Sequence, residues 1–347
     1  MMMTLAAICG AAAFVDLSTF RFLLDDYYEL VGMITEGARL HGGERLLSVD
    51  LLFRAGVALG GSHLFFQVAN AAALLVGAWA FYALLVRLGA KRNEALLALG
   101  LYIANPGAFP LLVRATGFQW LAAGALIMVV LWLVTVAAQT PRRGRRAAAL
   151  FAALAVLGLA VFVKYPATLL LPIVVLFWSS RVVPLPRGPV SRYAWPAVVI
   201  AAFFVPLALV IDPSTEHGEI AKIGATWVLP NTARLFELVT KNVAPLALLS
   251  LLLGIRCDLG TMGGVPWWRV WKRDFADAAR RPLGASSTWV LAGALSILLL
   301  IPTLFRRNGV PGYYIVTAFP WLVLPFVRMA ELRRSRGQTP AWAALIA

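Results

Sequence analysis

Long apolar runs decide the fold of this chain, and one of them, residues 119–138, reads QWLAAGALIMVVLWLVTVAA. A helix of about 18 or more such residues can cross the roughly 30 Å hydrocarbon core of a bilayer. Comparable runs occupy residues 64–86, 147–163, 193–211 and 286–303. The sequence lacks the short alternating strands that a closed transmembrane barrel needs. The pattern therefore predicts an all-α fold, a polytopic transmembrane helical bundle.

The composition agrees with a membrane protein. Of the 347 residues, 61% are hydrophobic and 14% are charged, whereas soluble domains carry about 25% charge. We predict a single integral membrane domain over residues 1–347, with about ten spans. The predicted spans lie near residues 1–16, 63–87, 94–113, 118–138, 147–163, 166–180, 193–211, 243–256, 286–303 and 313–328. The first segment has no basic residues ahead of its apolar run, which favours a retained span over a cleaved signal peptide.

The basic residues alternate between the predicted turns. One set of turns carries 20 Lys and Arg residues against five acids, and the other set carries 11 of each. The positive-inside rule places the first set in the cytoplasm, together with both termini. This asymmetry accounts for the net charge of +15, so nucleic-acid binding is not needed to explain it.

Three longer loops are predicted between the spans. Residues 17–62 and 212–242 are expected to lie outside, and residues 257–285 in the cytoplasm. The cytoplasmic loop contains the stretch 266–273, PWWRVWKR. Indole rings interleaved with cations are typical of a helix that lies on the membrane surface. We therefore predict an interfacial helix there.

The first outer loop begins with two adjacent carboxylates, Asp25 and Asp26, directly after the first apolar segment. Glu29 would share a helix face with Asp25, because the two residues are four positions apart. Farther on, residues 44–59 mix apolar side chains with a few charged ones. Such a helix should lie in the membrane interface. Charges beside a membrane are costly to desolvate, so they tend to mark functional sites.

The outer face thus collects groups that suit transfer from a phosphate. A carboxylate can act as general base for a hydroxyl acceptor, which makes Asp25 and Asp26 the candidate catalytic residues. Arginine and lysine can hold a phosphate leaving group. The candidates for binding the donor phosphate or the substrate are Glu29, Arg45, Arg54, Arg114, Lys164, His217, Arg306, Arg307 and Tyr313.

No cofactor is predicted with a defined site. The second carboxylate of the acidic pair could orient the first or bind a divalent cation such as Mg²⁺ or Mn²⁺. Cys9 and Cys257 lie far apart, and the sequence has no Cys/His cluster. Neither a zinc site nor a disulfide is therefore predicted.

The order of these features resembles the GT-C superfamily, membrane glycosyltransferases that use polyprenyl-phosphate-linked sugars. The residues that carry the resemblance are Asp25-Asp26-Tyr27-Tyr28, residues 41–48 (HGGERLLS) and residues 84–89 (LLVRLG). The resemblance implies that Asp25 or Asp26 is the catalytic acid. It implies a lipid-linked sugar donor, an envelope glycan, lipid or protein acceptor, and a bacterial inner membrane with the active face outside.

Two other functions fit the sequence. A transporter or flippase of lipid-linked sugars would use broken helices, and Pro106, Pro110, Pro172 and Pro206 could supply kinks. A polysaccharide polymerase or ligase would be expected to rely on outer-loop arginines and a histidine. His217 and Arg234 are the residues that would discriminate that function.

Overall fold

The fold of this protein is seen in a computed structural model, which describes residues 46–90, 92–105, 107–168, 171–182, 189–210, 228–237, 240, 261–262 and 265–266. The helices are η1 (Leu46–Leu51), α3 (Leu52–Ala58), α4 (His63–Arg87), α5 (Arg92–Ile103), α6 (Phe109–Val113), η2 (Ala115–Gly117), α7 (Phe118–Gln139), α8 (Arg143–Thr168), α9 (Leu171–Val182) and α10 (Pro189–Val210). Residues 228–237 are also helical. The predicted all-α class is confirmed, with one addition: a pair of two-residue antiparallel strands, β1 (Thr261–Met262) and β2 (Val265–Pro266).

Three helices are long and apolar enough to cross a membrane among the residues that the structure describes. They cover His63–Arg87, Ala115–Gln139 and Arg143–Lys164. These helices match three of the predicted spans, 63–87, 118–138 and 147–163. Two further spans, predicted at 166–180 and 193–211, correspond to helices α9 and α10. The predicted spans at 1–16, 243–256, 286–303 and 313–328 lie outside the described residues.

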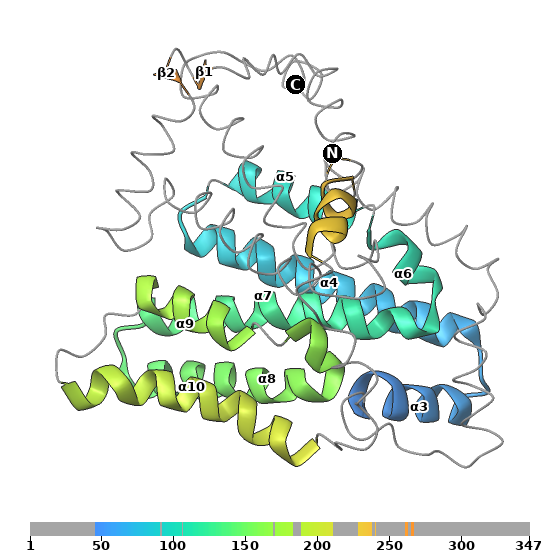
Figure 1. Ribbon diagram of the computed structural model, residues 1–347, viewed down its shortest axis with the longest axis horizontal. Helices are drawn as coiled ribbons and strands as arrows, with labels where there is room; N and C mark the ends of the chain where they lie inside the picture. The colour runs from blue at the N-terminus through green and yellow to red at the C-terminus, as the bar shows by residue number, and fades with distance from the viewer. Residues whose placement is uncertain are drawn as a thin grey trace.

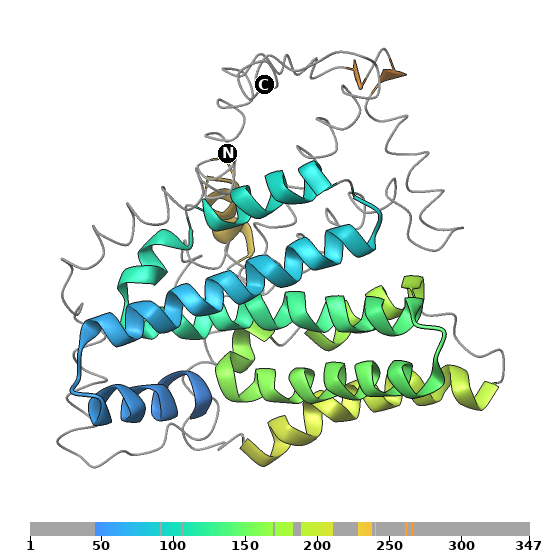
Figure 2. The same cartoon turned by 180° about the vertical axis from the view of Figure 1, so that it is seen from behind.

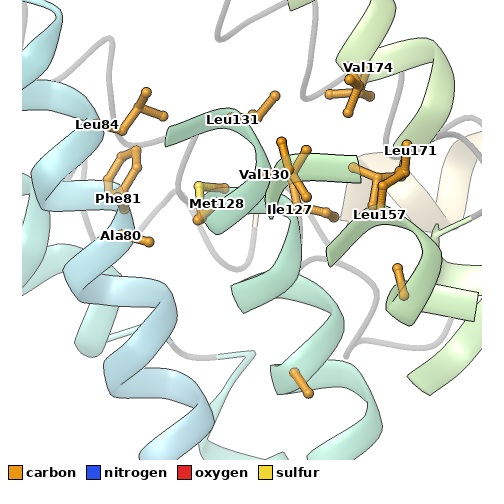
Figure 3. Close-up of a cluster of buried hydrophobic side chains, with 14 of the residues drawn as sticks. Ala80, Phe81, Leu84, Ile127, Met128, Val130, Leu131, Leu157, Leu171 and Val174 are labelled. Atoms are coloured by element: carbon orange, nitrogen blue, oxygen red, sulfur yellow. The ribbon is translucent and has the colours of Figure 1, made fainter. Parts of the chain in front are cut away.

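Helix α7 lies at the centre of the bundle (Figure 1, Figure 2). It packs along α4 on one side and along α8 on the other, and it also contacts α9. Figure 3 shows the side chains that fill these interfaces, with Phe81 and Leu84 of α4 on one side of α7 and Leu157 of α8 on the other. Every residue of the run 119–138 is buried or half-buried, which explains why the run is apolar on every face.

One predicted span, 94–113, was wrong as a single helix. Helix α5 ends at Ile103, and the separate short helix α6 begins at Phe109. The side-chain oxygen of Asn105 accepts a hydrogen bond from the Gly107 backbone N–H at 2.9 Å, which forms a tight turn. A proline at position 106 also disfavours helical backbone at Asn105. The chain therefore turns between α5 and α6, where the hydropathy predicted one continuous helix over 94–113.

Helix α8 continues beyond the predicted end of its span, but it is kinked. Lys164 has non-helical backbone angles, φ −169° and ψ 83°. A proline at position 166 has no N–H to donate to the preceding turn, which explains a break at this place. The predicted turn at 164–166 therefore corresponds to this break in α8.

The segment predicted as an interfacial helix over 44–59 is helical from Leu46 onward. Its first turn is π-helical (η1), and α3 follows directly. Val49 and Phe53 are fully buried against Phe66 of α4 and Ala115 of η2. Gly60 and Gly61 then adopt positive φ angles of 95° and 69°, which glycine tolerates, and reverse the chain into α4. This segment is thus attached to the bundle by its own small core.

Candidate functional site

Several polar side chains gather at one end of the bundle, which we name the α3 end. There η1 packs against α7 and α8, and α4 packs against α6 and η2. Both views place α3 beside the beginning of α4 and the kinked end of α8 (Figure 1, Figure 2). The elements come from distant parts of the chain, so the side chains they carry meet only in the folded protein.

Lys164 lies at the α8 kink and is 8% exposed. Its ammonium nitrogen lies 5.6 Å from the ring centroid of Trp120, in the first turn of α7. The negative face of an indole ring attracts a cation, so this contact offsets part of the cost of burying the charge. On the adjacent residue, the carbonyl oxygen of Val163 accepts a hydrogen bond from the hydroxyl of Ser48. Ser48 in η1 therefore holds the backbone beside Lys164.

Arg114 lies between α6 and η2 and is half-buried. Its carbonyl oxygen accepts a hydrogen bond of 2.6 Å from the Asn70 amide nitrogen. The same nitrogen lies 2.9 Å from the Leu111 carbonyl oxygen and 3.3 Å from that of Leu112. Asn70 thus satisfies carbonyl groups that the end of α6 leaves without helical partners.

Gly117 adds a steric constraint to the same segment. A Cβ atom at this position would collide with the carbonyl oxygen of Leu111 and lie 3.0 Å from its Cα atom. Only glycine allows the backbone of η2 to approach α6 so closely. The position of Arg114 is therefore fixed by a hydrogen-bonded amide on one side and a close backbone contact on the other.

Other buried polar residues at this end were missed by the sequence reasoning. Ser48, Asp50, Asn70 and Gln119 are each no more than 8% exposed. The side-chain oxygens of Asn70 and Gln119 accept no hydrogen bond within the part of the chain that the structure describes. Buried oxygens of this kind are suited to accept a hydrogen bond from a water or a ligand hydroxyl. The signal was available, because polar residues inside apolar spans commonly mark functional interiors.

The structure places two of the predicted site residues at the α3 end. Lys164 contacts Trp120 in the first turn of α7. Arg114 lies directly before η2, the short helix that leads into α7. Arg54, also predicted, is exposed on α3 at the same end. Arg234, the residue proposed to discriminate a polymerase or ligase, is exposed on the helix at 228–237. The remaining candidates lie outside the described residues: Asp25, Asp26, Glu29, Arg45, His217, Arg306, Arg307 and Tyr313.

The described residues offer no cluster of metal ligands. Within them, no group of three or more His, Cys, Asp or Glu side chains lies close enough to hold a metal ion. The predicted Mg²⁺ or Mn²⁺ would be held by the acidic pair at positions 25 and 26, outside this part of the chain. It therefore stays a prediction.

Comparisons with known proteins relate the fold to one solved structure. The sequence matches no protein-family model, and no curated protein matches it. The fold is similar to the crystal structure of ArnT from Cupriavidus metallidurans bound to undecaprenyl phosphate, with a TM-score of 0.61 and 17% sequence identity. The match covers 95% of this chain and 60% of that one. At this identity the similarity shows a shared fold, that of a polytopic membrane protein.

Proposed function

We propose that this protein is a membrane glycosyltransferase of the GT-C type that uses a polyprenyl-phosphate-linked sugar. The observation that carries the proposal is the shared fold with a protein whose structure holds undecaprenyl phosphate. The residues at the α3 end support it independently, because two cations, Arg114 and Lys164, occur there beside buried polar groups.

The phosphate of the donor would be bound by Arg114 and Lys164. An arginine can donate two parallel hydrogen bonds to phosphate oxygens, and a lysine acts as a compact point charge. Lys164 lies beside the apolar ring of Trp120 and is almost excluded from water. A charge in such surroundings interacts more strongly with an anion than it would in water. The polyprenyl chain would extend into the surrounding membrane.

The transfer step would use a carboxylate of the first outer loop. Asp25 or Asp26 takes the proton of the acceptor hydroxyl, and the hydroxyl oxygen forms a bond to the anomeric carbon of the sugar. The bond from that carbon to the phosphate oxygen breaks, and its electron pair leaves with the polyprenyl phosphate. Arg114 and Lys164 stabilise the negative charge that develops on the leaving group. The carboxamide oxygens of Asn70 and Gln119 can accept hydrogen bonds from sugar hydroxyls.

We further propose that the reaction takes place at the extracytoplasmic face of a bacterial inner membrane, with both termini in the cytoplasm. The acceptor would be an envelope glycan, lipid or protein. The positive-inside rule supports this orientation, because the arginine-rich turn between α7 and α8 lies at the opposite end of the bundle from Arg114 and Lys164 (Figure 1).

A transfer assay tests the proposal. Membranes that contain the wild-type protein, Asp25→Asn, Asp26→Asn or the control Glu237→Gln are supplied with polyprenyl-phosphate sugars, and the covalent product is measured. Loss of the general base should lower the rate by about 100-fold or more in one of the two Asp variants. The control replaces an exposed acid on the helix at 228–237 and should retain full activity.

Three outcomes would contradict the proposal in different ways. Full activity in both Asp variants would remove the catalytic role of the acidic pair. Accumulation of intact donor in proteoliposomes without a covalent product would indicate a flippase. A product that grows to many repeat units would indicate a polymerase.

A further inference from the structure

The exposed surface along α4 and α7 carries a second set of features, toward the end of the bundle opposite Arg114 and Lys164. We propose that this surface binds a diacyl phospholipid with an anionic headgroup. Arginines would hold its phosphate, and a pair of tryptophans would contact the upper part of its acyl chains. This site is independent of the proposed transferase site.

The headgroup end is built from five arginines: Arg87 at the end of α4, and Arg142, Arg143, Arg145 and Arg146 at the turn between α7 and α8. All are exposed except Arg146, which is half-buried. We name them the arginine end. The neighbouring stretch 91–94 adds two basic residues and one acidic residue, Lys91, Arg92 and Glu94. The net charge of this part of the sequence therefore stays positive.

A side-chain contact ties the two helices together at this place. The Gln139 amide nitrogen donates a hydrogen bond of 2.8 Å to the Arg87 carbonyl oxygen, and an Arg87 guanidinium nitrogen lies 3.5 Å from the Gln139 amide oxygen. Gln139 is the last residue of α7, and Arg142 follows three residues later. Arg87 is therefore held close to the arginines of the turn, although 55 positions separate Arg87 from Arg142 in the sequence.

The acyl-chain end is built from Trp79 of α4 and Trp132 of α7. Their rings contact each other edge to face, with centroids 5.0 Å apart. Trp79 is 54% exposed although it is one of the largest apolar side chains. Trp132 lies seven residues before Gln139, and two helical turns place these two residues on one face of α7. The tryptophan pair and the arginine end therefore belong to one surface of the bundle.

The dimensions suit a phospholipid. Eight residues separate Trp79 from Arg87, which corresponds to about 12 Å along the helix axis. Tryptophan favours the boundary between headgroups and acyl chains, while arginine reaches into the headgroup layer. The outward face of α4 continues the apolar surface through Val68, Leu75 and Val86, which are 44–55% exposed. Positive charge at one end and apolar surface along the rest match an anionic lipid.

Native mass spectrometry of the purified protein tests the proposal. The full chain is delipidated in detergent and titrated with phosphatidylglycerol or phosphatidylcholine of identical acyl chains. We expect preferential retention of phosphatidylglycerol. The triple variant R142Q/R143Q/R145Q should bind phosphatidylglycerol at least about tenfold more weakly, because each arginine contributes to the attraction of an anionic surface.

Three further variants and one competitor make the test decisive. The control R234Q removes an exposed arginine elsewhere and should bind as the wild type does. The variant W79L/W132L keeps the charges and should weaken both lipids, while Arg-to-Lys changes at positions 142, 143 and 145 should retain most of the preference. Equal retention of the two lipids by the wild type would overturn the proposal. So would competition by millimolar inorganic phosphate, which would indicate a site for a free anion.

Discussion

At the scale of single residues, two buried donors determine where the candidate phosphate-binding cations lie. Ser48 donates to the carbonyl oxygen next to Lys164, and Asn70 donates to the carbonyl oxygen of Arg114 itself. Neither donor belongs to the helix that carries the cation. The two cations are therefore positioned by tertiary contacts, and a change at Ser48 or Asn70 should reach the donor phosphate indirectly.

Replacement of Asn70 by leucine tests this positioning role. Leucine has a similar volume but cannot donate to the three carbonyl oxygens around Arg114, so this segment should shift. We expect the KM for the lipid-linked donor to rise about tenfold, equivalent to about 1.4 kcal/mol, with a smaller change in kcat. The control Thr135→Val removes another buried hydrogen bond, from the Trp178 indole nitrogen at 2.9 Å. It should affect thermal stability alone.

The sequence identified the cations but not the groups that hold them. Arg114 and Lys164 were predicted because charges at the ends of apolar spans stand out from their surroundings. Ser48 and Asn70 are uncharged, and their role depends on contacts with elements more than 40 positions away. Such contacts cannot be derived from the spacing of residues along one helix.

At the scale of helices, close packing of α4 against α7 holds the bundle together. A Cβ atom at Gly77 would collide with the Tyr102 hydroxyl oxygen and lie 3.1 Å from the Cα atom of Ala125 in α7. Small residues allow transmembrane helices to approach closely, and this packing replaces the hydrophobic driving force that lipid does not supply. The close contacts with Tyr102 and Ala125 therefore require a residue without a side chain at position 77.

Replacement of Gly77 by leucine should therefore destabilise the protein. Overpacking a well-packed interior costs about 1–3 kcal/mol, and we expect the Tm in detergent to fall by several degrees. Gly144→Ala provides the matched control, because nothing lies within 4 Å of a Cβ atom placed there. An equal Tm for the wild type and the Gly77 variant would show that the two helices are not packed as described.

Hydropathy predicted the helices better than it predicted their interruptions. The spans 63–87 and 118–138 agree with α4 and α7 to within one residue at each end. The break between α5 and α6 was missed because the residues on both sides are apolar, and average hydropathy does not register one turn. Asn105, followed by proline and Gly107, was the local signal that could have revealed it.

At the scale of the whole molecule, the two ends of the bundle differ in chemistry. The α3 end holds buried polar groups with Arg114 and Lys164, and the opposite end exposes the arginines of the α7–α8 turn. The positive-inside rule predicted only that the arginines of the α7–α8 turn lie at the opposite end from Arg114 and Lys164. The proposed functions divide in the same way, with donor binding at the first end and an anionic phospholipid at the second.

The central claim, that the α3 end binds a lipid phosphate, is tested most directly by equilibrium binding of undecaprenyl phosphate to the purified protein. The double variant Arg114→Gln/Lys164→Met should bind at least about 100-fold more weakly, since each charged hydrogen bond contributes about 1.5–3 kcal/mol. Undecaprenol, which lacks the phosphate, should bind wild type and double variant alike. The control Arg234→Gln should match the wild type. Undiminished affinity in a correctly folded double variant would contradict the claim.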